Sequence, residues 1–67
     1  MILKTALDIA KENKELIKKL PCTRGMEIIF EKLMEKFCVK LGEISVTELD
    51  SFRSATVHAY ETVIENE

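Results

Sequence analysis

Apolar side chains recur at helical spacing through three segments of the chain, and no stretch alternates in the manner of a β-strand. Pro21 and Gly25 mark the first break between these segments, and Gly42 marks the second. We therefore predict an all-α fold, a small three-helix bundle that forms a single domain over residues 1–67. The helices are expected at about 3–20, 24–41 and 46–65.

The first predicted helix has an apolar stripe that Asn13 and Lys14 interrupt in the middle. Pro21 should end this helix, because proline donates no backbone hydrogen bond and disfavours helical geometry in the residue before it. The stripe consists of Leu3, Ala6, Leu7, Ala10, Ile17 and Leu20.

The second predicted helix carries the clearest pattern, a broad apolar face between charged edges of opposite sign. Gly42 should follow this helix as a left-handed C-cap. The apolar face contains Met26, Ile29, Phe30, Leu33, Met34, Phe37 and Leu41.

The charged edges of the second helix are candidate partner-binding surfaces, because such edges can set the orientation and the partner of a helix pair. Ile28 and Val39 fall on the far side, where they could contact another helix or a partner. One edge is formed by Glu27, Glu31 and Glu35, and the other is formed by Lys32, Lys36 and Lys40.

The third predicted helix begins with a capping box, in which Ser45 is the N-cap and Glu48 lies three residues later. Arg53 is expected close to the apolar face, where it would extend to solvent or pair with an acid. The inner face is predicted from Leu49, Phe52, Thr56, Tyr60 and Val63.

A chain of 67 residues buries a small core, so association is a favoured source of further stability and a homodimer is one such form. Cys22 and Cys38 are interpreted as free thiols of a cytoplasmic protein. The net charge is −2, with six basic and three acidic residues in 1–24 but one basic and six acidic residues in 43–67. This distribution predicts weak or absent direct nucleic-acid binding.

No arrangement of residues typical of catalysis is visible, so we predict that the protein is not an enzyme. His58 is the single histidine and the two cysteines form no CxxC pair, which argues against a metal site. No Gly-rich phosphate loop predicts a cofactor, and no apolar run approaches the roughly 20 residues of a membrane span.

Residues 44–58 resemble a motif of the Hha/YmoA family, small helical modulators that bind the nucleoid protein H-NS. Residues 16–23 and 31–36 are also similar to segments of that family. The resemblance implies a transcription modulator acting through an H-NS-like partner, with Arg53, Val57 and His58 as further candidate contacts. Val57 stands where the family has an acidic residue. The matching positions are Ser45, Glu48, Leu49, Phe52, Ser54, Ala55 and His58.

Two other functions fit the same pattern. A small helical chaperone or assembly subunit, for instance of a secretion system, would cover its apolar faces with a client protein. A dimeric RNA-binding helical hairpin of the plasmid copy-control type would contact phosphates through basic residues near its N-terminus, namely Lys4, Lys11, Lys14 and Lys18.

Overall fold

The computed structural model describes residues 2–65 and confirms the all-α prediction, since these residues form helices and no β-strand. A short α-helix joins the first two of three long helices, a connection with a 3₁₀ turn joins the second to the third, and the described residues end in a π-helical turn. The elements are α1 (Ile2–Glu12), α2 (Lys14–Lys18), α3 (Cys22–Lys36), the 3₁₀ turn η1 (Leu41–Glu43), α4 (Val46–Tyr60) and the π-helical η2 (Glu61–Glu65).

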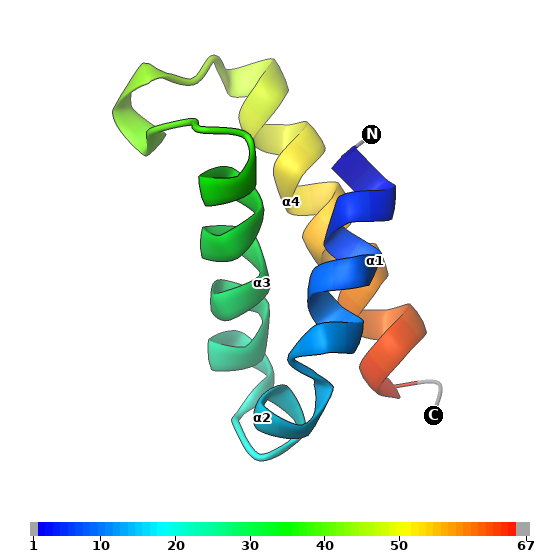
Figure 1. Cartoon of the computed structure of the whole chain (residues 1–67). Coiled ribbons are helices and arrows are strands. Elements are labelled where there is room, and N and C mark those ends of the chain that lie inside the picture. Colours follow the sequence, from blue (N-terminus) through cyan, green and yellow to red (C-terminus); the bar gives the residue numbers. More distant parts are fainter. Residues whose placement is uncertain (1, 66–67) are drawn as a thin grey trace.

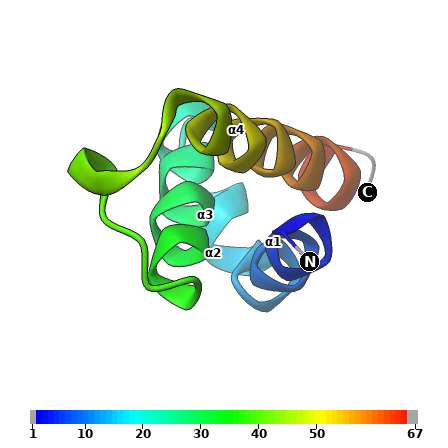
Figure 2. The same ribbon diagram turned by 90° about the horizontal axis from the view of Figure 1, so that it is seen from above.

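The three long helices surround one core (Figures 1 and 2). Seen along the bundle in Figure 2, α1, α3 and α4 form three sides of a triangle, and α2 closes one end. The helix α4 runs antiparallel to α3 and contacts both other long helices. The largest fully buried side chains are Ile9, Ile17, Ile29 and Leu33.

The single helix predicted over 3–20 is wrong, because the chain bends at Asn13 and forms two helices. At the bend, the Ile9 carbonyl accepts hydrogen bonds from both the Asn13 backbone N–H at 3.1 Å and the Asn13 side-chain amide at 2.8 Å. The bend brings α2 beneath the bundle and buries Ile17 completely. Ile9, which the predicted stripe omitted, is also buried, whereas Leu3 is exposed.

The predicted end of the second helix at Leu41 and Gly42 is also wrong, because α3 ends five residues earlier at Lys36. Cys38 adopts a left-handed conformation with φ of 53°, and its backbone N–H donates to the Glu35 carbonyl. The Val39 N–H donates to the Met34 carbonyl, which completes a Schellman motif. Val39 therefore packs against the core instead of lying on the far side of the helix.

The start of α4 agrees with the prediction. The Glu48 backbone N–H donates to the Ser45 Oγ at 3.2 Å, and that hydroxyl donates to the Glu48 carboxylate at 3.1 Å. Phe52, Thr56, Tyr60 and Val63 are buried as expected.

Gly25 allows α3 to pack closely against α2 and α4. A Cβ atom at this position would lie 2.8 Å from the Ile17 Cγ2 and 2.9 Å from the Tyr60 Cε2. These separations are shorter than van der Waals contact, so the absence of a side chain permits the observed packing. Gly25 thereby fixes the level at which α3 and α4 lie side by side.

Candidate protein-interaction site

An open groove of about 350 Å³ runs along the outer surface where α3 and α4 meet. Its floor and walls are mainly apolar, and a charged side chain stands on each helix. We call this feature the α3/α4 groove, and its lining residues are Thr23, Met26, Glu27, Phe30, Arg53, Thr56 and Val57.

The groove exists because the apolar stripe of α3 is wider than its neighbouring helices can cover. Ile29 and Leu33 point inward and are fully buried. Met26 and Phe30 lie further around the helix, where they contact the core but remain partly exposed. Across the groove, α4 contributes Val57, which is 41% exposed. Apolar surface from two helices is therefore accessible in one place.

One charged side chain from each helix lines the groove, Glu27 from α3 and Arg53 from α4. On α3, the Arg24 guanidinium donates to the Glu27 carboxylate at 2.7 Å in a solvent-exposed ion pair. On α4, Arg53 is exposed and lines the groove as well as an adjoining depression that contains His58 and Glu61. Arg53 thus combines the expected proximity to apolar residues with access to solvent.

Four of the predicted partner-binding residues are therefore brought into one region: Glu27, Arg53 and Val57 line the groove, and His58 lines the depression beside it. The prediction had placed them on two separate helices without relating their positions. Their proximity follows from the antiparallel packing of α3 on α4 (Figure 1).

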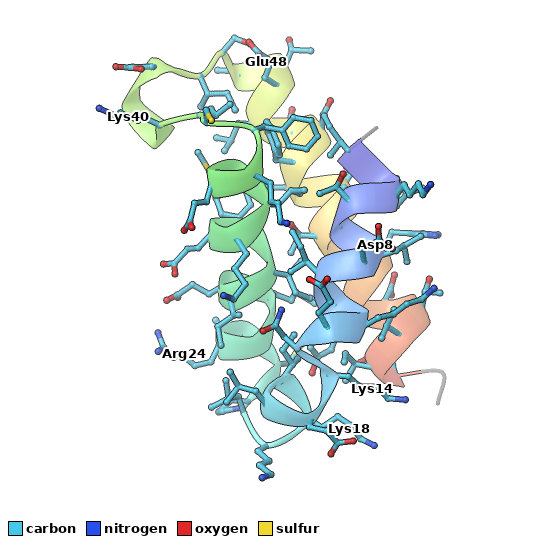
Figure 3. All side chains as sticks on the ribbon, in the orientation of Figure 1. Asp8, Lys14, Lys18, Arg24, Lys40 and Glu48 are labelled. Atoms are coloured by element: carbon cyan, nitrogen blue, oxygen red, sulfur yellow. The ribbon has the colours of Figure 1, made fainter. Side chains whose placement is uncertain are left out.

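The remaining predicted residues do not share this region. Lys32, Lys36 and Glu35 line a polar depression on the opposite side of α3, together with α1 residues. The predicted acidic edge is therefore divided, with Glu31 exposed between the two regions. Lys40 lies beyond the end of α3, in the exposed connection that Figure 3 shows, so it does not extend the Lys32–Lys36 edge. Ile28 is half-buried on α3.

Sequence reasoning missed Met26 and Phe30 as surface residues because both belong to the same stripe as the core residues. The signal was the width of that stripe, since seven apolar positions exceed what a single helix contact covers. Without the position of α4, the inward and outward halves of the stripe could not be separated.

Tyr60 is buried where α4 meets Gly25 of α3, and burial raises the pKa of its hydroxyl above the ordinary value of 10.0. The neighbouring Cys22 side chain raises this pKa further through an electrostatic interaction and a hydrogen bond, and Glu65 adds to the effect. The neutral phenol is therefore the form that the folded structure favours.

The basic residues proposed for RNA contact lie on two helices that the bend at Asn13 separates. Lys4 and Lys11 are on α1, whereas Lys14 and Lys18 belong to α2 at the closed end of the bundle (Figure 3). The four lysines are therefore divided between two helices.

Over residues 2–65, no group of three or more His, Cys, Asp or Glu side chains is arranged to hold a metal ion. None of the helices in that part of the chain has the length and apolar character needed to cross a membrane. Comparisons with protein-family models, with curated proteins and with solved structures found no match.

Proposed function

We propose that this chain is a non-enzymatic protein-interaction module that binds a helical segment of a partner protein in the α3/α4 groove. The observation that carries the proposal is the accessible apolar surface of Met26, Phe30 and Val57 between charged walls. Half-exposed apolar side chains with a polar rim are the usual composition of a protein interface. An amphipathic helix would insert its apolar face and align its charged edges with Glu27 and Arg53.

An H-NS-like nucleoid protein is the partner we propose, because the segment that resembles the Hha/YmoA family forms one wall of the groove. Within that segment, Arg53 and Val57 line the groove, and Ser54 and His58 line the adjoining depression. The chain would then act as a transcription modulator through its partner.

The proposal is tested by isothermal titration calorimetry with a purified H-NS-like protein and two matched variants. Val57→Lys places a charge in the groove and should weaken binding by at least about tenfold. Val46→Lys changes the same residue type on the same helix, at a position that is 76% exposed and outside the groove. This control should retain affinity within about twofold.

Equal effects of the two lysine variants would contradict the groove as the binding site. If the unmodified chain shows no heat of binding with an H-NS-like protein, that partner and the proposed family relationship are both wrong. Circular dichroism of each variant checks that both remain helical, so that lost binding is not caused by unfolding.

A further inference from the structure

We infer that, in the absence of its partner, a second copy of this chain occupies the α3/α4 groove and forms a reversible two-fold dimer. The inference rests on the proposed function because it assigns a self-partner to the same site. It is carried by the self-complementary distribution of charge on the two walls of the groove.

A two-fold axis that lies in the face of the groove, parallel to the helices, would place α3 of one copy over α4 of the other at the same level. The internal contacts define those levels. Gly25 of α3 is opposite Tyr60 of α4, and the rings of Phe37 and Phe52 are 5.7 Å apart at the other end. Residues 27–31 are therefore level with residues near 56–59.

In this arrangement, two pairs of opposite charges meet in each half of the interface. Glu31, which is exposed on α3 beside the groove, would lie within about one helical turn of Arg53 of the other copy, a separation that the long arginine side chain spans. Arg24, which projects away from α1 in Figure 3, would face Glu61 at the end of α4. Because a two-fold interface repeats every contact, both pairs occur twice.

The apolar centre of the same interface would be formed by Met26, Phe30 and Val57 of both copies. Each helix has 15 residues, so the shared face is about 22 Å long and about 20 Å wide. That footprint, about 440 Å² per copy, is below the standard size of about 800 Å² per partner, so we expect a weak dimer with a dissociation constant of about 10 to 100 µM. Partner binding would then compete with self-association.

Sedimentation equilibrium of the full chain from about 5 to about 500 µM tests the inference. We expect a monomer–dimer equilibrium that becomes at least about tenfold weaker in Arg53→Glu and in Glu31→Lys. Each variant alone places like charges opposite each other in both halves. When the two variants are mixed, every half has opposite charges again, so the heterodimer should recover an affinity near that of the unmodified chain.

A chain that stays monomeric throughout this range overturns the inference, as does a dimer that the charge reversals leave unchanged or that the mixture fails to restore. Lys36→Glu on the opposite side of α3 is the control for a general charge effect, and it should leave the dimer intact. A monomeric chain that still binds an H-NS-like protein through Val57 would refute the dimer alone. A charge-sensitive dimer without such binding would refute the proposed partner alone.

Discussion

The inner and outer halves of the apolar stripe on α3 have the same kind of side chains but different surroundings. Ile29 and Leu33 are enclosed by the bundle, whereas Met26 and Phe30 border an open groove. Both halves arise from one helical repeat. The difference teaches that a bundle of this size covers only part of the stripe and leaves the rest accessible, in the groove where we propose that a partner binds.

The enclosed half should dominate stability, so its truncation gives the largest expected effect. Leu33→Ala removes a fully buried side chain and should lower the free energy of unfolding by about 2–5 kcal/mol. Leu16→Ala is the matched control, because that leucine is 51% exposed and should cost less than about 0.5 kcal/mol. Urea unfolding followed by circular dichroism measures both. Comparable losses would show that burial does not separate these positions.

Close packing on the buried side of α3 is tested at Gly25. Gly25→Ala would force a methyl group against Ile17 and Tyr60, and overpacking costs about 1–3 kcal/mol. The higher helix propensity of alanine offsets up to about 1 kcal/mol of this loss in unfolding free energy. We therefore expect a net loss of about 1–2 kcal/mol in chemical denaturation.

Gly42→Ala is the control for this prediction. Nothing lies within 4 Å of the added atom, and the backbone there has no positive φ. This variant should be neutral or up to about 1 kcal/mol more stable. A Gly25→Ala protein that is as stable as Gly42→Ala would mean that α3 can move away from Tyr60 without cost.

The start of α4, which carries the other wall of the groove, gives a smaller effect. Ser45→Ala removes the acceptor for the Glu48 N–H and should cost about 1 kcal/mol of unfolding free energy. Ser51→Ala removes an exposed hydroxyl that bonds the Thr47 carbonyl within the helix, and it should be neutral or slightly stabilising. Thermal denaturation of the pair distinguishes a capping effect from a general effect of losing a serine.

The smallest expected effect concerns pH. The folded structure raises the pKa of Tyr60, so its contribution to stability is fully present below pH of about 10 and is lost as the pH rises through the folded pKa. Tyr60→Phe should remove this part of the alkaline loss of stability. Tyr60 is the single tyrosine, so tyrosinate absorbance in folded and urea-unfolded protein measures the two pKa values directly. An equal pKa in both states would refute the prediction.

The connection after α3 shows that tertiary packing, and not only local sequence, decides where that helix ends. The sequence contains Gly42, the residue that most readily ends a helix in a left-handed conformation. The chain instead adopts that conformation at Cys38, which is less favourable for a residue with a side chain. This position lets Val39 return to the core and Phe37 contact Phe52. Packing therefore outweighs the local preference.

By itself, the sequence determined the helical class, the capped start of α4 and the larger buried residues of the predicted inner face, namely Phe52, Thr56, Tyr60 and Val63, because these depend on local spacing and on hydrogen bonds between near neighbours. Only the tertiary structure decided the bend at Asn13, the end of α3 and the division of its stripe into core and groove. Those features depend on contacts between residues distant in the chain. The spacing along one helix does not specify which neighbour covers which side.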